Sequence, residues 1–222
     1  IKGGGKQDPA DATGIAHYLE HMLFKGTDQL GTVDYKSEKV YLDSIETFYN
    51  ILGQTSDSNK RASIQEKIND LNVKASDFAI PNEFNRIIEG FGGTGVNAFT
   101  SNDIIAYVSQ FPAHQIQKWL SINSHRFENP VFRLFQSELE TVYEEKNRSM
   151  DNAFRILFEQ FFANFFREHP YGQQTILGTK EHLKNPSIKK MKEYYETYYI
   201  SNNMTLILAG NFDVKSTIEA IK

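Results

Sequence analysis

The spacing of apolar residues along the chain predicts a mixture of helices and short strands. Apolar residues recur every three or four positions in two segments between residues 33 and 80, which is the period of an amphipathic helix. The residues are Tyr41, Ile45, Phe48 and Leu52 in the first segment, and Ile64, Ile68, Leu71, Ala75 and Phe78 in the second. The polar stretch 53–60 separates the two segments, so they are expected to form an αα-hairpin.

The other elements follow from similar local signals. Helices are expected from Ile15 to Phe24, after Pro112, through the stretch that ends near Arg148, over residues 187–199, and from Val214 onward. The glycine-rich loop 92–95 leads into a strand at residues 96–100, which would pair with a second strand at 104–108. Residues 204–209 have the pattern of a buried strand. Strands and helices without strict alternation indicate the α+β class.

One apolar stripe is exceptionally aromatic. Phe154, Phe158, Phe161 and Phe165 recur at helical spacing. Aromatic rings bury a large apolar area, so this stripe is expected to pack in the core.

Composition narrows the functional classes. The 222 residues are 40% apolar and 23% charged with a net charge of −4, and no Lys/Arg cluster offsets that charge, which disfavours nucleic acid or an anionic membrane as partner. No apolar run is long enough to span a bilayer. The absence of cysteine excludes disulfides, thiolate zinc sites and cysteine nucleophiles. The chain begins at Ile1 without an initiator Met or a signal pattern, so we expect a fragment of a longer protein.

The first helix carries the strongest chemical signal. His17, Glu20 and His21 lie at i, i+3 and i+4, so all three project from one helix face. Two imidazoles on one face can bind one zinc ion, and a catalytic zinc site adds a third protein ligand and a water. Glu20 is placed to take the proton of that water. A random His-x-x-Glu-His match in this composition is expected only about 0.01 times.

The third ligand has more than one candidate. Glu138 and Glu145 share a helix face with Val142, at i, i+7 and i+4, whereas Glu140 and Glu144 form a different pair at i, i+4. Spacing alone does not choose between the two faces, and a run of Glu on a helix is commonly solvated surface.

Several motifs together resemble one peptidase family. The segment 14–27, Gly-Ile-Ala-His-Tyr-Leu-Glu-His-Met-Leu-Phe-Lys-Gly-Thr, looks like the insulinase/pitrilysin family, which includes the mitochondrial processing peptidases and has the inverzincin signature His-x-x-Glu-His. Further segments agree with that family: Asn97 to Ser101, the Glu138/Val142/Glu145 spacing, His169-Pro-Tyr-Gly172 followed by Gly178, and the segment from Asn203 to Asp213.

The resemblance implies roles for individual residues. It makes Glu145 the third metal ligand beside His17 and His21, with one Zn²⁺ per chain, and Glu20 the catalytic general base. Glu138 would then accept an imidazole N–H and fix the tautomer of that ring. Asn97, Ala98 and Phe99 would lie on an edge strand that binds peptide substrate through main-chain hydrogen bonds.

The resemblance also implies an architecture and an activity. It predicts the zinc-bearing N-terminal domain of a zinc metalloendopeptidase, with a largely antiparallel sheet backed by helices. Such enzymes cut extended or unfolded peptides in a chamber made of two halves, so the remaining half would lie on the same chain or on a partner subunit. The main alternative is a non-catalytic scaffold or substrate-presenting subunit of a related complex. Metal storage has no histidine-rich tract to support it, and a bacterial periplasm or envelope is the favoured location.

One departure from the family pattern stands out. The distance from His21 to Glu145 is 124 residues, longer than usual for the family, and the expected hairpin at 33–80 accounts for the excess. It resembles an insertion beside the active site. Shaping of the substrate chamber and passive surface decoration are equally compatible with the sequence.

Overall fold

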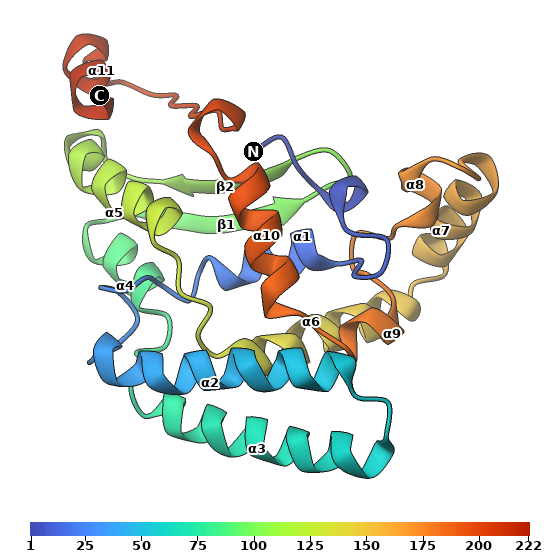
Figure 1. The fold of residues 1–222 in the computed structure, drawn as a ribbon. Coiled ribbons are helices and arrows are strands. Elements are labelled where there is room, and N and C mark those ends of the chain that lie inside the picture. The colour runs from blue at the N-terminus through green and yellow to red at the C-terminus, as the bar shows by residue number, and fades with distance from the viewer.

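The computed structural model describes residues 1–222 and has the predicted α+β class (Figure 1). Its regular elements in chain order are α1 (Ile15–Met22), α2 (Tyr35–Gln54), α3 (Ser58–Ser76), α4 (Glu83–Gly90), β1 (Thr94–Thr100), β2 (Ile105–Gln110), α5 (Ile116–Glu128), α6 (Phe135–Met150), α7 (Ala153–Phe165), α8 (Pro170–Gln173), α9 (Lys180–Leu183), α10 (Ile188–Tyr198) and α11 (Val214–Ile221). The predicted αα-hairpin, β-pair and helices are all present. No helix combines the length and the apolar character that crossing a membrane requires.

Helix α1 lies at the centre of the fold, where it contacts the β-hairpin, α6 and α10 (Figure 1). Its start is fixed by the buried carboxylate of Asp8, which accepts hydrogen bonds from the backbone N–H groups of Gly14 (2.6 Å) and Ala16 (2.9 Å). Gly14 has a positive φ of 92°, and a Cβ on it would lie 2.9 Å from the Cα of Gly178. Glycine is therefore required at position 14 to begin this helix against the 175–178 turn.

The hydrophobic core forms around α1. Ala16, Leu19, Met22 and Leu23 have no exposed surface. They belong to a cluster with residues of the other central helices: Ile45, Tyr49 and Leu52 of α2, Phe135, Leu139 and Val142 of α6, and Met191 and Tyr194 of α10. Because α1 is packed on most of its circumference, its polar residues are held at fixed positions.

The sheet is a single antiparallel pair, with Asn97 opposite Val108 and Thr100 opposite Ile105. The N-terminal residues run along β2, since Ile1 exchanges two backbone hydrogen bonds with Ile105 and Lys2 bridges to Ile104. No strand pairs with the opposite edge of β1.

A buried ion pair joins α2, the residues just before α6 and the loop that follows α1. The guanidinium of Arg133 donates to both carboxylate oxygens of Glu38, at 2.9 and 3.1 Å, and both side chains are almost fully buried. The same guanidinium donates to the backbone carbonyls of Lys25, Thr27 and Leu30. It therefore fixes the loop after α1 against the start of α6.

The expectation that the phenylalanine stripe packs in the core is wrong. Phe154, Phe161 and Phe165 are more than half exposed. Helix α7 projects to one side of the molecule and contacts mainly α6 and α8 (Figure 1), so no element covers its outer face. The rings instead stack on one another, with the centroids of Phe161 and Phe165 5.5 Å apart.

The expected strand at residues 204–209 is also absent. The segment is extended but makes no ladder, and Ile207 is 82% exposed. Strand structure requires a neighbouring strand as hydrogen-bond partner, and none lies beside this segment within residues 1–222.

Candidate metal centre

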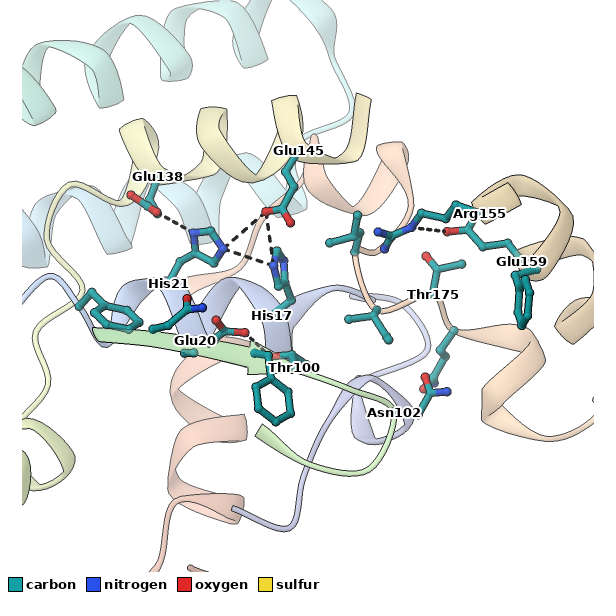
Figure 2. Close-up of a pocket in the computed structure, with 18 of the residues that line it drawn as sticks. His17, Glu20, His21, Thr100, Asn102, Glu138, Glu145, Arg155, Glu159 and Thr175 are labelled. Atoms are coloured by element: carbon teal, nitrogen blue, oxygen red, sulfur yellow. Dashed lines mark hydrogen bonds and ion pairs between the residues drawn. The ribbon is translucent and has the colours of Figure 1, made fainter. Parts of the chain in front are cut away.

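The face of α1 that carries His17, Glu20 and His21 borders a cavity of about 880 Å³. His17 and Glu20 are only 7% and 6% exposed, so the histidines are not the solvated pair of a surface helix. The opposite walls of the cavity are formed by β1, α6, α7 and residues 171–177 (Figure 2).

Three potential ligand atoms converge at this face (Figure 2). The Nε2 atoms of His17 and His21 are 3.3 Å apart, and Oε2 of Glu145 lies 3.5 Å from the first and 3.6 Å from the second. Zinc ligands at bond lengths of about 2.0–2.2 Å are about 3.3–3.6 Å apart in a tetrahedral arrangement. The triangle of these atoms therefore has the dimensions of one face of a zinc coordination tetrahedron.

Helix α6 supplies its carboxylates from the face that carries Glu138 and Glu145. Oε1 of Glu138 lies 2.8 Å from Nδ1 of His21, and its Oε2 forms an ion pair with Lys25. Glu140 and Glu144, the alternative pair, are exposed and lie outside the cavity. A carboxylate at Nδ1 directs Nε2 of the His21 ring toward the other two ligand atoms.

Glu20 is held by a hydrogen bond from β1. The hydroxyl of Thr100 donates to its Oε2 at 2.6 Å, which leaves Oε1 available for another hydrogen bond. Burial raises the pKa of Glu20, although the Thr100 hydrogen bond opposes that rise. A carboxylate with a raised pKa is a stronger base than a solvated Glu.

The two histidines differ in protonation. Burial, with smaller contributions from the charges of His21 and Arg155, lowers the pKa of His17 to about 3. Burial alone would also lower the pKa of His21, but the hydrogen bond and charge of Glu138, with the charges of Glu20 and Glu145, outweigh it and raise the pKa. His17 is therefore neutral over the physiological pH range. As the pH falls, His21 is protonated before His17.

The predicted substrate residues lie on the cavity wall. Asn97, Ala98 and Phe99 all line it, and Asn97 and Phe99 are exposed. They belong to β1, whose outer edge has no strand partner. The structure thus brings every predicted site residue to one cavity.

Three contacts of the site escaped the sequence reasoning. Thr100 and Lys25 each lie inside a recognised motif but carried no assigned role. The cavity wall formed by α7 includes Phe158, which the sequence pattern assigns to the core, and Arg155, Glu159 and Phe162, to which it assigns no role. On a helical wheel of α7, Arg155 and Glu159 fall on the same face as Phe158 and Phe162. Charged residues among these rings were the one sequence signal that this face lines a cavity.

Comparison with known proteins gives relatives across the whole chain. It is 25% identical over 181 residues to the zinc protease PqqE of Helicobacter pylori, covering 80% of this chain and 40% of that protein. It is 24% identical over 224 residues to the mitochondrial-processing peptidase subunit beta of Dictyostelium discoideum, covering 100% of this chain and 37% of that protein. The chain thus spans about two fifths of the length of these relatives.

Solved structures share the fold. The crystal structure of a protease from Helicobacter pylori superposes with a TM-score of 0.71 at 23% identity, over 99% of this chain and 42% of that one. The periplasmic protease PqqL from Escherichia coli gives 0.67 at 20% identity, over 100% of this chain and 20% of that one.

Family profiles cover nearly all of the sequence. The profile described as "Peptidase M16 inactive domain" matches residues 187–222. The profile of the insulinase family, peptidase family M16, matches residues 1–39 and 55–180 and omits residues 40–54, which form most of α2. Whether the helical hairpin is an insertion stays a prediction. With most of its length matched, and with the His-x-x-Glu-His segment inside the matched region, this chain belongs to the insulinase family, peptidase family M16.

Proposed function

We propose that this chain is the zinc-binding domain of a metalloendopeptidase, with His17, His21 and Glu145 as ligands of one zinc ion. The observation that carries the proposal is the triangle of ligand atoms with edges of 3.3, 3.5 and 3.6 Å. Two imidazoles and one carboxylate are a donor set that suits catalytic zinc, because the fourth position stays open for water or substrate. The names of the relatives support the same assignment.

The mechanism uses Glu20 as the proton carrier. A bound zinc ion supplies Lewis acidity that lowers the pKa of a water molecule and polarises a substrate carbonyl. Glu20 accepts the proton of the attacking water and later delivers it to the leaving amine nitrogen. Thr100 keeps one oxygen of Glu20 fixed, so that the other faces the cavity.

Zinc affinity should depend on pH through His21 rather than His17. Because the pKa of His21 is raised and that of His17 is lowered to about 3, a falling pH protonates His21 first and expels the metal. Affinity is expected to be constant above the raised pKa of His21 and to fall by tenfold per pH unit below it. Competition with a chelator between pH 5 and 9 measures the zinc affinity at each pH.

Glu138→Gln is the matched variant for that titration. The substitution removes the charge and weakens the hydrogen bond of Glu138, which contribute most to the raised pKa of His21. The pH at which zinc affinity begins to fall should therefore move lower. The affinity at high pH should drop by about 10–100-fold because the ring loses its orienting partner. If the pH at which affinity begins to fall is unchanged in this variant, the role given to His21 is wrong.

The substrate is proposed to bind as an added strand on the free edge of β1. An extended peptide beside residues 96–100 would pair through main-chain hydrogen bonds, which gives affinity with little sequence selectivity. Asn97 lies exposed at this edge, where its side chain can hydrogen-bond the peptide.

Strand addition has a signature with a period of two. In a series of peptides that carry one N-methyl group each, affinity for the Glu20→Gln protein should fall at alternate positions, since only every second N–H of an edge strand faces its neighbour. Equal loss at every position, or no loss, would contradict strand addition.

This chain by itself is expected to be a weak peptidase even with zinc bound. Stabilisation of the developing oxyanion by preorganised donors is a large catalytic contribution, and removal of one donor costs about 10²–10³ in rate. The family resemblance assigns such donors, an Arg and a Tyr, to the opposite half of the chamber. A quenched peptide assayed with residues 1–222 alone, then with the complementary part of the parent protein or its partner subunit, measures the difference. Full activity of the chain alone would refute the expectation.

The location proposed for the enzyme is the bacterial periplasm or envelope. The periplasmic protease PqqL is among the proteins with the same fold, which supports this. Fractionation of cells that express the tagged parent protein tests it.

A further inference from the structure

One face of α7 forms a wall of the cavity opposite the metal centre. Arg155, Phe158, Glu159 and Phe162 occupy positions i, i+3, i+4 and i+7 and all line the cavity. Figure 2 shows the guanidinium of Arg155 extending away from α7 into the cavity, toward the side on which Glu145 lies.

Of the two Lys and Arg side chains that line the cavity, Lys25 and Arg155, only Arg155 lacks a close carboxylate partner of its own. Lys25 is occupied by its ion pair with Glu138. Glu159 is shared, because its Oε1 lies 3.6 Å from Nζ of the buried Lys146 and 3.7 Å from Nε of Arg155. Lys146 thus offsets the charge of Glu159, and Arg155 is left as a cation without a carboxylate of its own.

The free donors of Arg155 are the ones that face the cavity. The side chain is 41% exposed, and its only polar contact is the loose approach of Nε to Glu159, which is longer than a hydrogen bond. Both terminal nitrogens therefore keep their N–H groups unpaired within the protein. A guanidinium in this state matches the two oxygens of a carboxylate in a bidentate pair.

We propose that Arg155 binds a carboxylate of the peptide substrate, so that the site selects peptides with an acidic side chain or a free C-terminus placed against α7. The inference rests on the proposed function, since it takes the cavity as the peptide site and the charge of Glu145 as neutralised by the metal. Phe158 and Phe162 on the same face would contact the apolar part of the peptide beside that carboxylate.

The test compares matched peptides on a protein that cannot cut them. Fluorescent peptides of one sequence, with Glu, Gln or Lys at a single scanned position, are titrated into zinc-loaded Glu20→Gln protein. At one position the Glu peptide should bind about five- to tenfold more tightly than the Gln peptide, an effect between that of an exposed ion pair and that of a charge-assisted hydrogen bond. The Lys peptide should bind more weakly than either.

Arg155→Gln, made in the same background, should reduce the Glu-to-Gln ratio to about one while the zinc content stays at one per chain. Arg148→Gln is the control, because Arg148 is an exposed arginine on α6 that does not line the cavity, and it should keep the full ratio. Glu159→Gln should increase the ratio, since it removes the carboxylate that competes for Arg155.

The source of the carboxylate is separated by a second pair of peptides. If the preference disappears when a free C-terminus is amidated and no internal Glu restores it, the C-terminal carboxylate is the ligand. A preference that follows an internal Glu assigns the side chain. Three results would overturn the proposal. They are a Glu-to-Gln affinity ratio of one in the Glu20→Gln protein that keeps Arg155, a ratio that survives Arg155→Gln, and no binding by any peptide. Zinc content, measured separately, reports on the metal centre and keeps a failure here distinct from a failure of the proposed function.

Discussion

Glu20→Gln is expected to leave one zinc per chain in place while peptide hydrolysis falls by about 10²–10⁴-fold. The amide keeps the size of the side chain and can still hydrogen-bond with Thr100, but it has no carboxylate to accept the proton of the attacking water. Glu20 is not among the three residues whose ligand atoms converge, so its loss should not weaken metal binding. Metal analysis and a hydrolysis assay on the assembled peptidase measure the two quantities on one preparation.

His21→Ala is the matched contrast to Glu20→Gln. It removes a ligand atom and should abolish both zinc binding and hydrolysis, because two remaining donors do not complete a catalytic zinc site. The pair of variants therefore separates binding from chemistry on adjacent residues of one helix. Loss of zinc from Glu20→Gln together with retention by His21→Ala would reverse the roles assigned here.

Glu38→Gln is expected to lower the free energy of unfolding by about 3–5 kcal/mol, because it leaves the charge of Arg133 buried without a counter-ion. Glu38 and Arg133 are 0% and 1% exposed, so water cannot replace the lost partner. Chemical denaturation followed by circular dichroism measures the change. Zinc affinity should fall as well, because the guanidinium of Arg133 fixes the loop after α1 against the start of α6.

Glu46→Gln provides the control on the same helix. Glu46 pairs with the half-exposed Lys192, and surface ion pairs of this kind contribute only about 0–1 kcal/mol. The large effect should therefore belong to the buried pair alone. Comparable destabilisation by the two substitutions would mean that the burial of Glu38 and Arg133 does not govern the stability of this interface.

The parts of the fold that could be predicted are those fixed by local pattern. The αα-hairpin follows from apolar residues at helical spacing in two segments with a polar stretch between them, and the β-pair follows from a glycine-rich loop before alternating residues. The convergence of His17 and His21 was predictable for the same reason, since one turn of helix brings the two rings together. Glu145 could be chosen over Glu144 only through the family resemblance, because the distance between α1 and α6 is set by tertiary packing.

The parts that failed depend on what lies next to a segment. The phenylalanine stripe of α7 has the pattern of a core helix, but no element covers it within residues 1–222. Residues 204–209 have the pattern of a strand but no strand beside them. The pair formed by Glu38 and Arg133 joins positions 95 residues apart, and no local signal marks either residue.

The most direct test of the central claim is the zinc content of Glu145→Gln beside that of Glu144→Gln, both measured by metal analysis after dialysis. Glu144 is the adjacent, exposed carboxylate on the other face of α6, so the two variants differ only in whether a ligand atom is removed. We expect one zinc per chain in the unmodified protein and in Glu144→Gln, and little or none in Glu145→Gln. Full zinc retention by Glu145→Gln, or its loss from Glu144→Gln alone, would contradict the assignment of His17, His21 and Glu145 as the metal centre.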